Sequence, residues 1–277
     1  MKNTTKTFAF FGTPEVASDT LEILCDAGYI PKVIITSPDR RSGRGMNMTD
    51  TPVSIWARAH NIECLKPEKI TAEFIEEFKK WGVDLSIVIA YGKILPEDII
   101  EVPALGTINI HYSLLPKYRG ASPVEEAILR GDEFTGVCIQ EMKYKLDSGP
   151  ILALEEVKID NDETKVELLE KLTIIGANLL VNKLPDILEK NIEPKGQDES
   201  RASYCTKMSK EDGELDLNTD ATVNYNKYRA FYGWPGVFFF KDGKRIKITK
   251  AKYENDSFII ERVIPEGKKE IDFNILK

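Results

Sequence analysis

Short apolar runs alternate with amphipathic stretches over roughly the first 190 residues of the chain. The apolar runs predict strands at 8–11, 33–36, 84–90, 107–111, 136–144 and 151–159. The amphipathic stretches predict helices at 15–27, 54–60, 74–81, 96–101, 125–130 and 165–188. Strands that alternate with helices are typical of a doubly wound, mostly parallel sheet. We therefore expect a Rossmann-like α/β domain over residues 1–190.

The pattern changes after residue 190. Residues 191–203 are polar and rich in turn formers, which is typical of a linker. Alternating apolar positions then predict strands at 238–240, 245–253 and 257–263, with a fourth candidate at 271–275. Asp242 and Gly243 predict a two-residue hairpin turn. We expect a small β domain over residues 204–277.

Composition narrows the class of protein. The chain has 277 residues, of which 42% are hydrophobic and 30% charged, as in an ordinary globular protein. Its first residues lack a signal-peptide pattern and no later run is long enough to span a membrane, so we expect a cytoplasmic protein with no membrane partner. A net charge of −7 argues against indiscriminate nucleic-acid binding but permits a local basic face. Four scattered cysteines and two histidines give no metal-ligand pattern, so no metal is expected.

The most informative pair of residues lies in the expected strand at 107–111. Because successive side chains on a strand point to opposite faces, Asn109 and His111 share one face, while Ile108 and Ile110 share the other. The strand ends directly before a turn, at the kind of edge where open α/β sheets place their chemistry. An amide can donate to a developing oxyanion and an imidazole can transfer a proton. This pairing favours acyl transfer over a purely structural role.

Two other turns are explained by ordinary structural roles. Gly12-Thr13-Pro14 contains one glycine, which does not predict a dinucleotide site, and it suggests Thr13 as a helix N-cap with Pro14 at the first helical position. Residues 145–150 carry one carboxylate, Asp147, beside a glycine. An ordinary turn role is sufficient for it. The sequence alone does not bring Asp147 near His111.

The chain resembles the formyltransferases that use 10-formyltetrahydrofolate. The resemblance runs nearly from end to end, and the segment at 108–123 is its most specific part. The matching motifs are FFGTPEVA, TSPDRRSGRG, VIAYGKILP, INIHYSLLPKYRGASP, TGV, LDSGPIL, YCTKMS and WPG.

The resemblance implies a catalytic triad of Asn109, His111 and Asp147. It implies direct formyl transfer from 10-formyltetrahydrofolate to an amine through a tetrahedral intermediate, with Asn109 and protonated His111 stabilising the oxyanion. Asp147 would orient His111 and accept the proton that the amine loses. The family's folate site corresponds here to Ser113, Leu114, Leu115 and Pro116, and to Tyr91, Gly92, Ile94 and Leu95.

The acceptor is indicated by a different segment. The loop at 37–51 is basic and looks mobile, and an ordinary solvated surface loop is its default interpretation. In the branch of the family that acts on initiator methionyl-tRNA, for translation initiation, the matching loop contacts the tRNA, which implies Arg40, Arg41 and Arg44 as tRNA-binding residues. A monomer is expected. Two alternatives stay open: a sugar-nucleotide N-formyltransferase with the same donor and triad, and a non-catalytic tRNA- or folate-binding module.

Three features depart from the family pattern: two positions and the length of the C-terminal domain. Tyr112 replaces a small residue, which we expect to narrow the folate cleft, and Pro150 stands where an Asp is common. The C-terminal domain is too short for the five strands of an OB-type barrel. We therefore expect a small, shortened OB-like domain whose contribution to tRNA binding is reduced.

Overall fold

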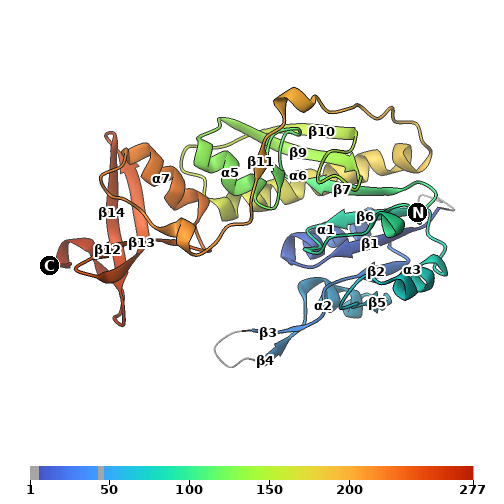
Figure 1. Ribbon diagram of the computed structural model, residues 1–277, viewed down its shortest axis with the longest axis horizontal. Coiled ribbons are helices and arrows are strands. Elements are labelled where there is room, and N and C mark those ends of the chain that lie inside the picture. Colours follow the sequence, from blue (N-terminus) through green and yellow to red (C-terminus); the bar gives the residue numbers. More distant parts are fainter. Residues whose placement is uncertain (1–5, 43–46, 277) are drawn as a thin grey trace. The chain divides into compact units, whose positions relative to one another are not determined.

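The chain folds into two compact units. The computed structural model describes residues 6–42 and 47–276 (Figure 1). Unit 1 comprises residues 1–119, 136–156 and 170–203, and unit 2 comprises residues 120–135, 157–169 and 204–277.

Seven α-helices and fifteen strands are present in the described residues. The helices are α1 (Glu15–Asp26), α2 (Pro52–Ala59), α3 (Ala72–Lys79), α4 (Glu97–Ile100), α5 (Pro123–Arg130), α6 (Lys165–Leu188) and α7 (Ala221–Ala230). The first ten strands are β1 (Phe8–Gly12), β2 (Val33–Ile35), β3 (Arg40–Ser42), β4 (Asn47–Thr49), β5 (Cys64–Leu65), β6 (Leu85–Ile89), β7 (Thr107–His111), β8 (Arg119–Gly120), β9 (Phe134–Glu141) and β10 (Ile151–Lys158). The last five are β11 (Tyr204–Cys205), β12 (Val237–Lys241), β13 (Lys244–Glu254), β14 (Ser257–Pro265) and β15 (Ile271–Asp272).

Unit 1 is built on a seven-stranded sheet with the order β10-β9-β7-β6-β1-β2-β5. Strands β5, β2, β1, β6 and β7 are parallel, and β9 is antiparallel to β7. All five residues of β1 and of β6 are buried, as expected for strands covered on both faces. The chain leaves β1 toward β2 on one side and returns to β6 on the other. The predicted doubly wound, mostly parallel sheet is confirmed, with its switch point between β1 and β6.

Strand β7 has one face packed against the core. Gly176 of α6 lies so close to this face that an added Cβ would stand 2.9 Å from Val137 and 3.3 Å from Ile110. Tyr112 lies beside the same glycine and is buried. The expectation that Tyr112 narrows the folate cleft is not supported, because Tyr112 packs beside Gly176 of α6. Asn109 and His111 occupy the opposite face.

The segment at 37–51 contains more regular structure than its sequence predicts. Strands β3 and β4 pair in an antiparallel hairpin, with Arg40 opposite Thr49 and Arg41 opposite Met48. The interpretation of 37–51 as a loop without strands is therefore wrong. Polar residues at most of these positions concealed the strands, since the pattern of alternating apolar residues is absent.

Unit 2 contains an antiparallel sheet with the order β12-β13-β14-β15. Lys241 pairs with Lys244 across the Asp242-Gly243 turn, whose positive φ values of 51° and 72° fit the predicted two-residue hairpin. The fourth candidate strand is confirmed in part: β15 ends at Asp272, and a 3₁₀ turn follows over Phe273–Ile275.

Helix α7 was not predicted from the sequence. Asp220 caps it by accepting hydrogen bonds from the backbone N–H groups of Thr222 and Val223. Its buried positions include asparagine, arginine and tyrosine, so the apolar stripe that marks a helix is missing. The Tyr225 ring stacks on Tyr253 of β13 at 5.6 Å between centroids.

No helix among residues 6–42 and 47–276 combines the length and apolar character that a membrane crossing requires.

Candidate active site

Both ring nitrogens of His111 face oxygen atoms. Nε2 lies 2.9 Å from the carbonyl oxygen of Tyr118, and Nδ1 lies 3.7 Å from Oδ2 of Asp147. A carbonyl oxygen only accepts hydrogen bonds, so Nε2 carries a hydrogen in this arrangement. Nδ1 is consequently the atom that can take up or release a proton. The His111 side chain is 6% exposed and that of Asp147 13%, so the pair is shielded from bulk water.

Asp147 lies in the turn between β9 and β10, in the left-handed backbone region with φ of 47°. Its Oδ1 accepts a hydrogen bond of 3.0 Å from the side-chain amide of Gln140 on β9. The other carboxylate oxygen is thereby directed to His111. The turn crosses close to β9, because a Cβ on Gly149 would stand 1.7 Å from the carbonyl oxygen of Glu141. Only glycine fits there.

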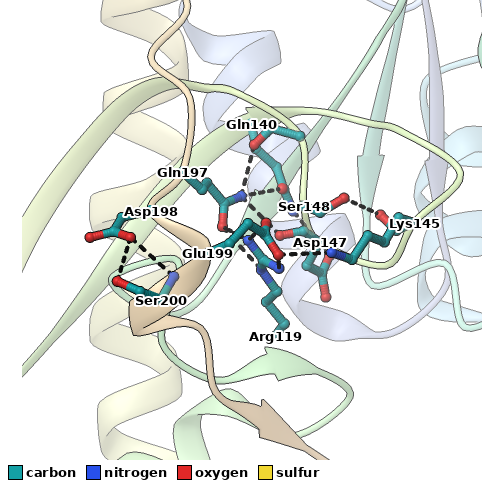
Figure 2. Close-up of polar contacts among 10 residues, drawn as sticks. Arg119, Gln140, Lys145, Asp147, Ser148, Gln197, Asp198, Glu199 and Ser200 are labelled. Carbon is teal, nitrogen blue, oxygen red and sulfur yellow. Dashed lines mark hydrogen bonds and ion pairs between the residues drawn. The ribbon is translucent and has the colours of Figure 1, made fainter.

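A polar network continues from the Asp147 turn (Figure 2). Gln197 Nε2 donates to the carbonyl oxygens of Asp147 and Gly149, at 2.9 and 2.7 Å. Gln197 Oε1 accepts two hydrogen bonds from the Arg119 guanidinium, at 3.1 and 2.7 Å. Glu199 accepts from Arg119 at 3.2 and 2.7 Å and from Lys145 at 2.8 Å. These residues come from three separate segments of unit 1.

Asn109 is half-buried on the same face of β7 as His111. It is the register partner of Gln140 in the β7–β9 ladder, and His111 is the partner of Cys138. Directly opposed residues share a face. Within the part of the chain that the structure describes, no hydrogen bond is formed by the Asn109 side-chain amide. This amide is available to an oxygen of a bound substrate.

The residues implied as a folate site have different surroundings. Ile94 is 89% exposed and Gly92 is exposed, whereas Tyr91 and Leu95 are buried in the hydrophobic cluster with Phe11. Burial raises the pKa of Tyr91 to about 12. In this segment, Gly92 and Ile94 are accessible to a ligand, while Tyr91 and Leu95 anchor the loop.

The second implied folate segment forms a tight turn after β7. Ser113 is fully buried and its hydroxyl donates to the Lys117 carbonyl at 2.6 Å, which holds the turn closed. Leu115 is buried, and Leu114 and Pro116 are half-buried. Leu114 packs against Gly136 of β9, where an added Cβ would stand 2.5 Å from its side chain.

Thr13 connects the loops at the switch point. Its hydroxyl donates to the carbonyl oxygen of Tyr91 at 2.9 Å and lies 3.2 Å from the hydroxyl of Ser37. Helix α1 instead begins after Pro14, which occupies the N-cap position without a side-chain hydrogen bond. The predicted N-cap role of Thr13 is therefore wrong. The Thr13 hydroxyl instead binds the loop that follows β6. Local capping patterns do not indicate a contact between segments so far apart in the sequence.

The three arginines implied as tRNA-binding residues are placed to different extents. Arg40 is exposed at the start of β3, and Arg41 follows it in that strand. Arg44 lies outside the described residues. In the sheet of unit 2, Lys250 is paired with Glu261 and Lys252 with Glu254, so these two positive charges are neutralised locally.

Gln140, Gln197 and Arg119 are the site residues that sequence reasoning missed. The antiparallel register of β7 and β9 could have indicated Gln140, since it lies opposite Asn109. Gln197 falls in the polar segment expected as a linker, where nothing in the local pattern marks it. Arg119 is completely buried, contrary to the usual behaviour of arginine. No group of three or more His, Cys, Asp or Glu side chains suited to a metal ion is found among the described residues.

The fold is a doubly wound α/β sheet, and an amide, an imidazole and a carboxylate lie together at the end of β7. Family models for formyl transferase and for the formyl transferase C-terminal domain match residues 6–184 and 207–273. The chain therefore belongs to the formyl transferase family.

Individual relatives agree with this family. The methionyl-tRNA formyltransferase of Sulfurihydrogenibium sp. (strain YO3AOP1) is 41% identical over 245 residues, covering 88% of this chain and 79% of that protein. That of Lachnospira eligens is 40% identical over 243 residues, covering 87% and 77%.

Solved structures share the fold at low sequence identity. The methionyl-tRNA formyltransferase from Clostridium thermocellum has a TM-score of 0.63 at 16% identity, covering 96% of this chain and 99% of that chain. A sugar N-formyltransferase from Shewanella sp. FDAARGOS_354 has a TM-score of 0.69 at 17% identity, covering 89% and 98%. Since enzymes with different acceptors share this fold, the fold does not identify the acceptor.

Proposed function

We propose that this protein transfers the formyl group of 10-formyltetrahydrofolate to the α-amine of initiator methionyl-tRNA. One observation carries the proposal: the unpartnered Asn109 amide and His111 Nδ1 share one face at the end of β7, with the Asp147 carboxylate 3.7 Å from Nδ1. The identity of 41% to a protein named methionyl-tRNA formyltransferase supports this acceptor. We also propose a monomer that acts in the cytoplasm, where translation starts.

The donor supplies the formyl carbon, and the protein's residues supply the electrostatics. As the amine nitrogen bonds to that carbon, negative charge develops on the formyl oxygen. The Asn109 amide and a protonated His111 Nδ1 donate hydrogen bonds to this oxygen. The Asp147 carboxylate stabilises the imidazolium and takes the proton that the amine releases. That proton finally reaches the folate nitrogen when its bond to the formyl carbon breaks.

The distance of 3.7 Å between Nδ1 and Oδ2 suits this chemistry. It is longer than a direct hydrogen bond, so Nδ1–H is not held by the carboxylate and is available to donate to a substrate oxygen. Catalytic hydrogen bonds commonly tighten only when substrate is bound. Among the residues that the structure describes beside His111, no side chain combines a hydroxyl or thiol nucleophile with a base: Ser113 donates to a carbonyl, and burial raises the pKa of Cys138 to about 11. A direct transfer therefore fits better than a covalent enzyme intermediate.

The loops at the switch point are proposed to hold the donor. We propose that Gly92 and the exposed Ile94 offer backbone and apolar surface to the donor, and that Leu114 in the turn after β7 contributes a further apolar surface. We propose that Arg40, Arg41 and Arg44 contact phosphates or base edges of the tRNA.

A parallel acceptor assay tests this function. The purified protein is incubated with 10-formyltetrahydrofolate and either charged initiator tRNA or amino-sugar nucleotides, and the formylated products are quantified. Formylation of the tRNA alone is the expected result. Formylation of an amino-sugar nucleotide alone would assign the protein to the other acceptor class. If neither acceptor is formylated and His111→Ala leaves tRNA and folate binding unchanged, a non-catalytic binding module would replace the proposal.

A further inference from the structure

Arg119 stands out because it is a charged side chain buried without contact to the proposed reacting atoms. It is 0% exposed, and its guanidinium reaches Gln197 and Glu199 on the segment before β11. Burying a charge is costly unless it is paired and hydrogen-bonded. The hydrogen-bond partners of Arg119 therefore indicate what this side chain holds in place.

The guanidinium fixes the orientation of one amide. Two of its N–H groups, Nε and Nη2, converge on Gln197 Oε1. Because the oxygen of Gln197 is held there, its Nε2 atom points in the other direction, toward the Asp147 turn. There it donates to the carbonyl oxygens of Asp147 and Gly149 at 2.9 and 2.7 Å. A lysine could not supply this fork of donors.

The Asp147 turn needs this support. Asp147 itself has a positive φ of 47°, which is unfavourable for a residue with a side chain and persists only where the surroundings impose it. Glu199 extends the support, since it bridges Arg119 and Lys145 of the same turn. In Figure 2, dashed lines connect Gln197 to Arg119 and to the turn, and connect Glu199 to Arg119 and to Lys145.

The backbone beside Arg119 supports the other member of the pair. Tyr118 precedes Arg119, has φ of 57°, and accepts the hydrogen bond from His111 Nε2. Its N–H donates to the Ser203 hydroxyl at 2.9 Å, and the Arg119 N–H donates to the Ser203 carbonyl at 2.9 Å. One short segment thus holds the His111 ring through its backbone and the Asp147 turn through its side chain.

We infer that Arg119 and Gln197 are positioning residues that hold Asp147 at its working distance from His111. The inference rests on the proposed function for its kinetic readout. It concerns residues that touch neither substrate in the proposed mechanism, and it assigns a role in the reaction to the segment expected as a linker.

Two variants of Gln197 separate the two ends of its amide. Gln197→Glu keeps an acceptor for Arg119 but cannot donate to the Asp147 and Gly149 carbonyls. Gln197→Met removes both ends at nearly constant volume. Ser200→Ala is the matched control in the same segment, because the Ser200 hydroxyl and N–H contact only Asp198 among the interactions described for them. Arg119→Lys tests whether a charge without the guanidinium fork suffices.

Kinetics give the first readout. For formyl transfer, both Gln197 variants and Arg119→Lys are expected to lower kcat roughly 10- to 100-fold, since small misplacements of a catalytic group have effects of this size. The KM values for donor and acceptor should change little. If the variants only unfold more easily, and keep the wild-type kcat at a temperature where they are folded, the inference would be overturned.

NMR of the free protein gives a second readout that does not depend on activity. The sequence has two histidines, so the ring signals of His111 are assigned by comparison with a His60→Gln variant. The His111 signals should move in Gln197→Glu and Gln197→Met, and remain in place in Ser200→Ala, with His60 as internal reference. Unmoved His111 signals would overturn the inference. Moved signals in a protein that formylates neither acceptor would instead support the positioning role and reject the proposed function.

Discussion

Two of the arginine side chains that the structure describes are buried, one in each unit, and their partners differ. Arg119 contacts side chains that lead to the Asp147 turn, as described above. Arg229 of α7 donates to the backbone carbonyls of Asp160 and Glu163, and to Oδ1 of Asn226 at 2.6 Å. Its guanidinium also lies 5.4 Å from the centre of the Tyr225 ring.

The comparison shows that burial of a charge does not by itself mark a functional site. Burial lowers the pKa of Arg229, and its partners are mainly carbonyl groups that precede α6 or lie on its own helix. Those contacts connect α7 to the segment before α6, and both lie in unit 2. The contacts of Arg119 continue through Gln197 to the backbone of the turn that carries Asp147, whose carboxylate faces His111. We therefore expect Arg229 to act on stability and the Arg119 network to act on turnover.

The largest predicted effect concerns Asn109, which shares a face of β7 with His111. Asn109→Ala removes the proposed oxyanion donor and should lower kcat by roughly two to three orders of magnitude. The thermal unfolding midpoint should stay close to that of the wild type, since the Asn109 amide has no described hydrogen bond to lose. Steady-state formyl transfer and thermal melts measure the two quantities.

Asn191→Ala, at an exposed position of unit 1, serves as the control and should leave both quantities unchanged. Full activity of Asn109→Ala would remove Asn109 from the mechanism.

The next prediction tests the other side of the comparison. Arg229→Met removes charged hydrogen bonds to the Asp160 and Glu163 carbonyls and to the buried Asn226 side chain, which should reduce the free energy of unfolding by about 2–3 kcal/mol. Turnover per folded molecule should be unchanged. Urea unfolding and active-site titration make this measurement.

Arg130→Met is the matched control, since Arg130 is exposed and paired with Glu126 one helical turn away. It should cost less than about 0.5 kcal/mol. If Arg229→Met lowered kcat per folded molecule as much as Gln197→Met, the distinction between the two arginines would fail.

The sequence predicted those parts of the fold that depend on local periodicity. The parallel sheet of unit 1, the face shared by Asn109 and His111, and the Asp242-Gly243 hairpin all follow from alternation or turn chemistry. Helix α7 did not follow, because tyrosine, asparagine and Arg229 replace an aliphatic stripe on its buried side.

The candidate site was less predictable than the fold, because most of its contacts join residues that are distant in the sequence. Period-two alternation is enough to pair Asn109 with His111. The approach of Asp147 to His111 depends on a turn some 36 positions further along the chain, and only the family resemblance suggested it. Gln197 and Arg119 depend on a contact between residues 78 positions apart, in which both partners carry polar side chains that normally face solvent. Local patterns contain no signal for such a contact.

Arg44 tests a third role for arginine, in which the partner belongs to a substrate. Arg44→Ala should raise the KM for charged initiator tRNA and lower the slope of log KM against log salt concentration by about one, as expected for one lost phosphate contact. The KM for the folate donor should stay constant. An equal loss of donor affinity would place the residue in the donor site and contradict a tRNA-facing role.

The smallest predicted effect tests whether Arg119 acts through compensation of its charge by Glu199 or through orientation of the Gln197 amide. Hydrogen bonds from Arg119, and then from Lys145, hold the pKa of Glu199 at about 2, below its ordinary value of 4.5. Above pH 4.5 the carboxylate is ionised in both the folded and unfolded chain, and its pairing favours the folded state in full. As the pH falls from about 4.5 to about 2, the unfolded chain takes up the proton first, and this stabilisation is lost.

Glu199→Gln should therefore be slightly less stable than the wild type at neutral pH, and the difference should vanish as the pH approaches 2. The effect should be small because the Glu199 side chain is 56% exposed. Urea unfolding at pH 7, 4 and 3 measures it. Since the Gln197 amide still lies between Arg119 and the Asp147 turn, kcat should change far less than in Gln197→Met. A loss of kcat equal to that of Gln197→Met would mean that compensation of the buried charge, and not orientation of the amide, is what Arg119 contributes to the site.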